Sequence, residues 1–476
     1  MSNKTTLTFY SGLDTIGGTV MALSYGNDRI IMEMGNAYDP LTDIYNKDVL
    51  YRKRSFLQDA LWLTTAPKID GIYAKNLLGD SELIPAEASN INTAVFISHL
   101  HLDHMCNMGL VSPLVKVYIS QKALMIENSL DTIGKGIISQ RNNYDFLEDK
   151  KPVKIGAIQV IPFLLNDDSF QDYSFYIKTP DLKIHFTGDL FVYGKYRKPI
   201  LREIAYLKKE NIDILVCEGT SFMDSIKKRV YPNPDEPICG TLRLLNGLYT
   251  KNQLDKRIIS IIKAHQDLCF INFYQREMSD VQDFEAYAKE TDRCLVYEPD
   301  TAYLINDFFH RAVNIYLPDS AYYLDNDAKW LKQVLEYNHL ITQKELKDNG
   351  HKYLVELSYQ NTLELLDYID IKTSYLHHSG EPLGEYDPAF KQLNMILKKT
   401  NTEYINLFDD RFFAHAYPNQ IQYYINAIDP KILIPVHTLN RDRFQASKHG
   451  KRILVELNHS YYYDNEELLE VKNNEH

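Results

Sequence analysis

The sequence predicts a mixed α/β protein, and three patterns support this fold class. Residues 6–33 read as short strands joined by glycine-containing turns, which is typical of an antiparallel sheet. Between about residues 225 and 400, apolar strands alternate with helical stretches, as in a parallel sheet covered by helices. Four apolar strands outside this block each end in a histidine or a carboxylate. These patterns predict two different sheets and a functional site at a sheet edge.

The N-terminal part is predicted to contain strands at residues 6–10, 19–24 and 29–33. Gly26-Asn27-Asp28, between the second and third strands, is a hairpin signal. The earlier glycines lack the spacing of a phosphate-binding loop. Further along, the pattern predicts a helix within residues 52–64, a strand at 114–119 and a helix at 121–128.

The middle block begins after a proline-rich stretch at residues 232–237, which is typical of a linker. Strands are predicted at residues 268–274, 294–298 and 314–317, and helices at 281–290 and 303–309. An apolar strand that ends at His437 follows this block. If His437 lies close to the histidines at positions 99–104, the middle block is an insertion and the C-terminal segment completes the first domain.

Residues 98–104, Ser-His-Leu-His-Leu-Asp-His, follow the apolar strand 94–97. In an extended segment His99, His101 and Asp103 point to one side, and a turn can bring His104 round to them. A single histidine is more often a satisfied core or surface residue than a ligand. Three imidazoles and one carboxylate together are the ligands expected for zinc, manganese or iron. This stretch therefore predicts a metal site.

Three later strands end in residues of the same chemical kind. Asp189 follows a strand that ends in Thr-Gly, Glu218 follows residues 212–217, and His437 follows residues 431–436. Acids at strand ends are common, so Asp189 or Glu218 would be weak evidence alone. Together with the histidine cluster they predict one site assembled at the edge of a buried sheet.

Composition limits the function classes. No run of about 20 apolar residues is present, so no membrane partner is expected, and residues 1–5 lack a signal-peptide pattern. The five cysteines are scattered and odd in number, which fits a cytoplasmic protein without disulfides. The net charge of −12 weakens the case for a nucleic-acid ligand without excluding it. A pair of divalent ions would add about four positive charges to a site.

These motifs resemble the metallo-β-lactamase superfamily, and specifically its β-CASP branch of ribonuclease J-like metallo-hydrolases. His99-x-His101-x-Asp103-His104 matches the HxHxDH motif of this family, and Asp189 in Thr-Gly-Asp matches its bridging aspartate. Glu218 matches the acidic motif A, and the stretches containing His415 and His437 match motifs B and C. The resemblance covers nearly the whole chain.

The resemblance implies an αββα sandwich with an inserted αβα β-CASP domain. Its boundaries would be residues 1–225 for the first part of the metallo-β-lactamase domain, 226–400 for the insertion and 401–476 for the completing part. It also implies two divalent ions, zinc or alternatively manganese. The implied ligands are His99, His101, Asp103, His104, Asp168, Asp189 and His437.

The activity implied by the resemblance is phosphodiester cleavage in RNA through a metal-activated hydroxide. Asp189 would bridge the ions and Asp103 would orient the nucleophile as well as ligate. Glu218 would accept a hydrogen bond from a ligand histidine or from motif B. His415 would contact the scissile phosphate or protonate the leaving group. The related J-type ribonucleases form dimers or larger assemblies, so a homo-oligomer is expected by analogy.

Two positions depart from the family pattern. Asp168 stands where the family has a ligand histidine, and Phe413-Ala414 stands where Ser-Gly is expected before His415. A carboxylate at position 168 can still ligate, but it favours harder ions. Two alternatives therefore stay open. One is a hydrolase of a small phosphorylated or ester substrate, because fold does not fix substrate. The other is a catalytically weak paralogue that binds RNA or a protein partner.

Metal analysis of the purified wild type and of Asp168→His tests the role of Asp168. We expect two equivalents in the wild type, because a carboxylate can ligate zinc or manganese. One equivalent or none in the wild type, rising in Asp168→His, would mean that Asp168 has disabled the first site.

Overall fold

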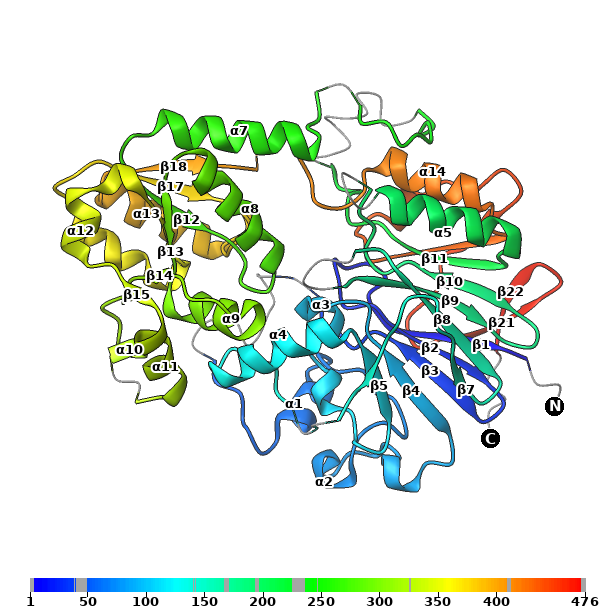
Figure 1. Ribbon diagram of the computed structural model, residues 1–476. Coiled ribbons are helices and arrows are strands. Elements are labelled where there is room, and N and C mark those ends of the chain that lie inside the picture. Colours follow the sequence, from blue (N-terminus) through cyan, green and yellow to red (C-terminus); the bar gives the residue numbers. More distant parts are fainter. Residues whose placement is uncertain are drawn as a thin grey trace.

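The computed structural model describes residues 4–37, 39, 49–139, 141, 143–166, 171–192, 197–224, 236–245, 247–324, 327–408 and 412–471. The protein is a mixed α/β protein with two lobes (Figure 1). One lobe contains two large sheets, and the other contains a smaller parallel sheet with helices around it. The proline-rich stretch proposed as a linker lies largely outside the described residues.

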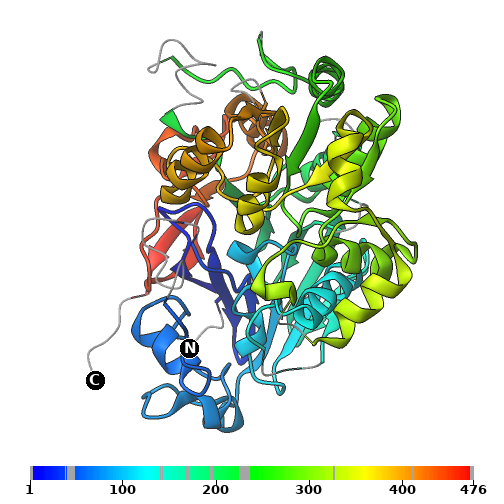
Figure 2. The ribbon, with the colours of Figure 1, turned by 90° about the vertical axis from the view of Figure 1, so that its left-hand side faces the viewer.

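The first large sheet has eight strands in the order β22-β21-β1-β2-β3-β4-β5-β6. Its N-terminal strands are antiparallel, and β3 to β6 are parallel to one another. The C-terminal strands β21 and β22 extend the sheet beside β1, as Figure 2 shows. The strands are β1 (Thr6–Ser11), β2 (Val20–Tyr25), β3 (Asp28–Met32), β4 (Asn92–Phe96), β5 (Lys116–Ile119), β6 (Asp145–Phe146), β21 (Ser460–Asp464) and β22 (Glu467–Glu470).

The second large sheet has seven strands in the order β20-β19-β11-β10-β9-β8-β7. Strands β7 to β10 are antiparallel, whereas β10, β11, β19 and β20 run parallel. The strands are β7 (Val153–Ile155), β8 (Ile158–Leu164), β9 (Tyr173–Lys178), β10 (Lys183–Phe186), β11 (Ile214–Glu218), β19 (Ile432–Val436) and β20 (Lys451–Arg452).

The two large sheets pack face to face around a shared apolar core. Phe96 of the first sheet and Phe175 of the second meet edge to face, with ring centroids 6.0 Å apart. The outer face of the first sheet packs against α1 (Phe56–Trp62) and α4 (Gln121–Thr132). The outer face of the second packs against α5 (Arg197–Glu210) and α14 (Pro418–Ile428), which lie side by side (Figure 1). The lobe is thus a four-layer arrangement of helices, sheet, sheet and helices.

The second lobe is built on a five-stranded parallel sheet in the order β13-β16-β12-β17-β18. Its strands are β12 (Leu268–Asn272), β13 (Cys294–Val296), β16 (Tyr353–Glu356), β17 (Thr373–His377) and β18 (Thr402–Asn406). They all lie in sequence between β11 and β19, which pair directly in the second large sheet. The lobe therefore enters the chain between two neighbouring strands.

The remaining helices are short or belong mainly to the second lobe. None of the helices among the described residues combines the length and apolar character needed to cross a membrane. The remaining α-helices are α2 (Lys75–Leu78), α3 (Leu102–Met105), α7 (Lys251–Ala264), α8 (Met278–Glu290), α9 (Pro299–Phe309), α10 (Ala321–Leu324), α11 (Lys329–Tyr337), α12 (Gln343–Asp348) and α13 (Pro388–Lys399). The second lobe also contains a 3₁₀ helix at Tyr359–Tyr368 and a short two-stranded sheet of β14 (Asn314–Ile315) and β15 (His339–Leu340).

Two buried glutamates lie close together at the carboxyl edge of the small sheet. Glu356 ends β16, and it accepts hydrogen bonds from the Glu298 backbone N–H at 3.0 Å and the Thr301 hydroxyl at 2.6 Å. Burial, together with the nearby Glu298 carboxylate, raises the pKa of Glu356 to about 8, from an ordinary value of 4.5. The folded protein therefore holds a proton here that the unfolded chain would release.

We expect the free energy of unfolding to fall as the pH rises from about 5 to 8, by up to about 1.4 kcal/mol per pH unit for this one proton. The stabilisation is complete below the ordinary glutamate pKa and is lost as the pH passes the raised value. Glu356→Gln mimics the protonated side chain and should remove this part of the slope. Urea unfolding of both proteins at pH 5, 6.5 and 8 measures how the free energy of unfolding changes with pH. The same pH dependence in the wild type and in Glu356→Gln would contradict the raised pKa of Glu356.

Candidate metal centre

The histidine cluster lies directly after β4, where the chain turns into α3. His99 and His104 are buried, and His101 is partly exposed. Glycines from the N-terminal segment allow the chain to pass close to this turn. A Cβ on Gly17, whose φ is +71°, would lie 2.2 Å from Asp103 Oδ2. Gly17 therefore serves a close approach to a candidate ligand.

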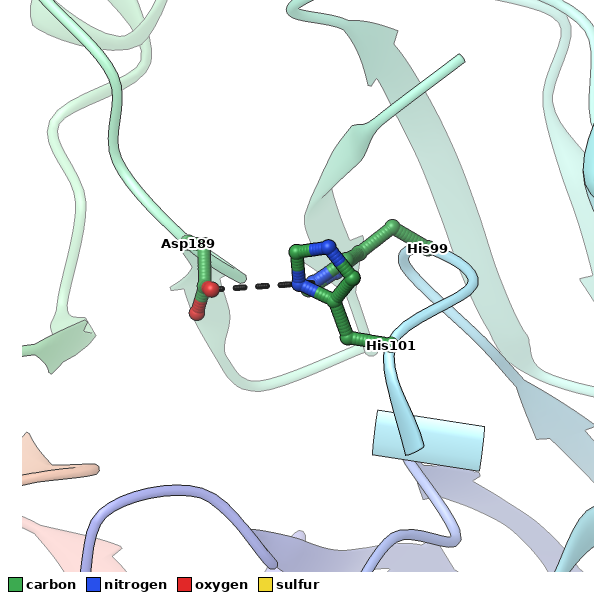
Figure 3. Close-up of side chains that lie close together, drawn as sticks. All are labelled: His99, His101 and Asp189. Carbon is green, nitrogen blue, oxygen red and sulfur yellow. Dashed lines mark hydrogen bonds and ion pairs between the residues drawn. The ribbon is translucent and has the colours of Figure 1, made fainter. Parts of the chain in front are cut away.

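Three predicted ligands form a first group, in which the ligand atoms of His99, His101 and Asp189 all lie within 4.8 Å of one another. His99 Nε2 is 3.1 Å from His101 Nδ1 and 3.6 Å from Asp189 Oδ2. Figure 3 shows the two imidazole rings and the carboxylate turned toward a common point. The two histidines come from the loop after β4, and Asp189 comes from the loop after β10.

Asp103, His104 and His437 form a second group with the same spacing limit. His437 Nε2 is 3.2 Å from Asp103 Oδ2, and His104 Nε2 is 3.5 Å from the same oxygen. His437 follows β19 and has a left-handed backbone, with φ 54°. Such a conformation costs energy in a residue other than glycine and is often retained at functional sites.

The Asp189 carboxylate lies between the two groups. Its Oδ2 faces His99, while its Oδ1 is 3.3 Å from His104 Nε2 and 3.7 Å from His437 Nε2. Asp189 is 4% exposed, and Oδ1 has no hydrogen-bond donor among the described residues. A carboxylate with one oxygen toward each group has the arrangement of a bridging ligand.

The residues present fit a pair of divalent cations. Buried polar atoms normally have partners, yet Nε2 of His104 and Oδ1 of Asp189 lack hydrogen bonds within the described chain. Imidazoles and carboxylates are the donors that zinc and manganese accept. Three protein ligands per group leave a position for another ligand, as in catalytic zinc sites.

Charges within the cluster are strongly interdependent. Burial by itself lowers the pKa of His104, but the Asp189 and Asp103 carboxylates outweigh it and hold the pKa well above its usual value. Burial raises the pKa of Asp189, but His104 and neighbouring histidines bring it well below the ordinary range. The carboxylates therefore favour positive charge at His104, whereas burial and the neighbouring His104 hold the pKa of His99 well below its usual value.

Three candidate ligand histidines have a polar partner for their second ring nitrogen within the large lobe. His99 Nδ1 is 2.8 Å from Ser98 Oγ, and His104 Nδ1 is 3.4 Å from Glu33 Oε1. His437 Nδ1 is 2.8 Å from Thr220 Oγ1. Such contacts orient an imidazole, and here they leave the Nε2 atoms of the three rings facing the other candidate ligands.

Glu218 supports this arrangement without belonging to either group. Its Oε2 accepts hydrogen bonds from the Thr220 backbone N–H at 2.7 Å and the Thr220 hydroxyl at 2.9 Å. Because the hydroxyl donates to Glu218, it accepts a hydrogen bond from Nδ1–H of His437. Glu218 therefore sets the tautomer of His437 through Thr220.

His415 lies at the rim of the site, with Nδ1 3.3 Å from Glu218 Oε1 and 3.8 Å from Asp189 Oδ2. Burial lowers the pKa of His415, but these two carboxylates outweigh it and raise the pKa to about 9. The Phe413 ring is 5.6 Å from the imidazole, and the Phe191 ring is 5.4 Å from it, centroid to centroid. Phe413 and Phe191 thus flank His415.

Asp168 lies outside the described residues, so its role as a ligand stays a prediction. The other predicted site residues are all in or beside the two groups. Sequence reasoning missed the supporting residues Ser98, Glu33 and Thr220. It also missed Glu277 of the second lobe, whose Oε2 is 3.5 Å from His101 Nε2. Ser98 and Thr220 adjoin the motifs, but no pattern singled out Glu33 or Glu277.

No protein-family model matches this sequence, and neither does any curated protein. Among solved structures, the chain is similar to a protein of unknown function from Enterococcus faecalis V583, at 24% identity and a TM-score of 0.74. That match covers 97% of this chain and 100% of the other, and it indicates a shared fold. The metallo-β-lactamase fold protein YhfI from Bacillus subtilis matches 48% of this chain and 76% of its own, at 14% identity and a TM-score of 0.28.

Single-residue variants should separate the two groups. We expect two metal equivalents in the wild type, one in His99→Ala and one in His437→Ala, because each histidine belongs to one group. Asp189→Asn should retain fewer than one equivalent, because Asp189 faces both. Elemental analysis after dialysis against zinc measures this, and exposed His351→Ala is the matched control. Equal metal content in His99→Ala, His437→Ala and the wild type would contradict the grouping.

Proposed function

We propose that the protein is a metal-dependent hydrolase that cleaves phosphodiester bonds in RNA. We further propose that it has the metallo-β-lactamase fold with a β-CASP-like insertion and that it belongs to the β-CASP branch, whose motifs its sequence resembles. The observation that carries the proposal is the position of Asp189, with one carboxylate oxygen toward each of two groups of ligand atoms. Two cations held in this way suit in-line displacement at phosphorus.

Divalent ions bound there would supply Lewis acidity toward a phosphate and lower the pKa of water. Asp103 is placed to ligate and to orient an attacking water, since its Oδ2 faces the second group. His415 would donate a proton to the leaving oxygen, a role supported by the position of its ring beside Asp189 and by its 17% exposure. Oε1 of Glu218 contacts Nδ1 of His415, so Glu218 is a positioning residue for His415.

The position of the second lobe favours the interpretation that the substrate is large rather than small. The segment after the carboxyl end of β12 reaches the metal centre, and ligands of parallel sheets bind outside those ends. Tyr274, in the loop after β12, has its ring centroid 6.0 Å from that of His101. An aromatic side chain beside the site could stack on a nucleotide base.

A hydrolase of a small phosphorylated or ester substrate is the second candidate. The net charge of −12 and the Glu277 carboxylate beside His101 favour it, because a polyanion is repelled by both. The salt dependence of ligand binding separates the candidates. An RNA backbone that releases counterions gives a steep slope of affinity against salt, and a small ligand does not.

Cleavage of labelled single-stranded RNA with manganese or zinc tests the proposal. We expect His415→Ala to lower kcat by roughly 10²–10⁴-fold, as for loss of a general acid, with both metal equivalents retained. Asp189→Asn should be inactive, which excludes a contaminating ribonuclease, and His351→Ala should match the wild type. Full-rate cleavage by His415→Ala would remove its assigned role. Turnover of small phosphodiesters or esters with no RNA cleavage would support the second candidate instead.

A further inference from the structure

The carboxylate of Glu277 reaches the metal centre from the second lobe. We propose that Glu277 is a positioning residue for the first group: it holds His101 so that one ring nitrogen faces the cation, and the docking of the second lobe sets this contact. The inference rests on the metal centre assumed in the proposed function and adds a residue from the other lobe to its support.

The two ring nitrogens of His101 face different partners. Nδ1 is 3.1 Å from His99 Nε2, and so it points into the first group. Nε2 is 3.5 Å from Glu277 Oε2. A neutral imidazole has one N–H donor and one lone pair. A carboxylate at Nε2 favours the tautomer with Nε2–H, which leaves the Nδ1 lone pair for a cation.

Glu277 is itself held in one conformation. It is the residue before α8, and its backbone N–H donates to Tyr274 O at 2.9 Å while its carbonyl accepts from Asp280 N at 3.0 Å. Its Oε1 accepts a hydrogen bond from the Ser279 hydroxyl. With Oε1 occupied in this way, Oε2 is the oxygen that faces His101.

The neighbouring residues dock this segment onto the large lobe. Arg276 Nη1 donates to Glu127 Oε2 of α4 at 2.6 Å, and both side chains are 6% exposed. Arg276 Nη2 donates to Lys135 O at 3.1 Å, and Lys135 Nζ donates to Gln275 Oε1 at 2.9 Å. A buried ion pair is strongly weakened by displacement, because an unpaired buried charge is costly. Glu277 is therefore held over His101 by contacts one and two residues away.

His101 differs in this respect from the other three ligand histidines. His99, His104 and His437 are oriented by residues of the large lobe itself. Only the first group would therefore lose support if the Glu277 carboxylate were removed. The expected consequence is a weaker first cation and an unchanged second one.

Metal affinity in single-group backgrounds tests this directly. In His437→Ala, which keeps the first group, we expect Glu277→Ala to weaken Zn²⁺ or Co²⁺ binding by about 10–100-fold, the usual effect of losing such a partner. Glu277→Gln keeps an acceptor oxygen and should lose less. In His99→Ala, which keeps the second group, Glu277→Ala should leave the affinity unchanged. Chelator competition and the visible spectrum of bound Co²⁺ are the readouts.

Glu290→Ala is the matched control, because Glu290 is an exposed glutamate on the same helix, α8. Equal first-group affinity in Glu277→Ala and Glu290→Ala would overturn the inference while leaving the proposed function intact. A loss of affinity in both single-group backgrounds would also overturn it, because it would indicate general destabilisation. A wild type that binds no metal would remove both proposals. Metal loss in Glu277→Ala without RNA cleavage by the wild type would remove only the RNA substrate.

Discussion

The position of Asp189 is the constraint on which the site depends. A buried carboxylate with an unsatisfied oxygen is costly. Here three histidines from two separate segments face its two oxygens. The same cost applies to His104, whose Nε2 has no hydrogen bond among the described residues. An arrangement of this kind is favourable when cations balance the charge, and its burial then keeps the ligands in fixed positions.

The sheet topology brings these ligands together. Strands β10, β11 and β19 are parallel neighbours, with Glu218 opposite Val436 in the register. Their carboxyl ends therefore meet at one edge, where Glu218 ends β11 and where Asp189 and His437 lie in the loops after β10 and β19. The long segment between β11 and β19 leaves the sheet at this same edge. An insertion at this point places a second lobe beside the site without disturbing strand pairing.

The sequence predicted which candidate ligands come together better than it predicted the residues that support them. The cluster from His99 to His104 is local, and strand-end residues of parallel neighbours meet by topology, so both follow from pattern. The contact between His104 and Glu33 does not follow from a sequence pattern, because the pairing of β3 with β4 brings Glu33 to His104. The left-handed backbone of His437 also has no sequence signal. The C-terminal pair β21 and β22 was missed because its partner, β1, lies at the other end of the chain.

The contact of Glu277 with His101 was the hardest feature of the site to predict from sequence patterns. Nothing in the local sequence of Glu277 suggests a metal centre, and it reaches His101 because Arg276 pairs with Glu127, 149 residues earlier. Such a contact depends on how two lobes dock, which periodicity and strand ends do not specify. The same dependence gives it a consequence that a contact within one lobe lacks. The orientation of His101, and with it the first group, responds to the position of the second lobe, whereas the second group does not.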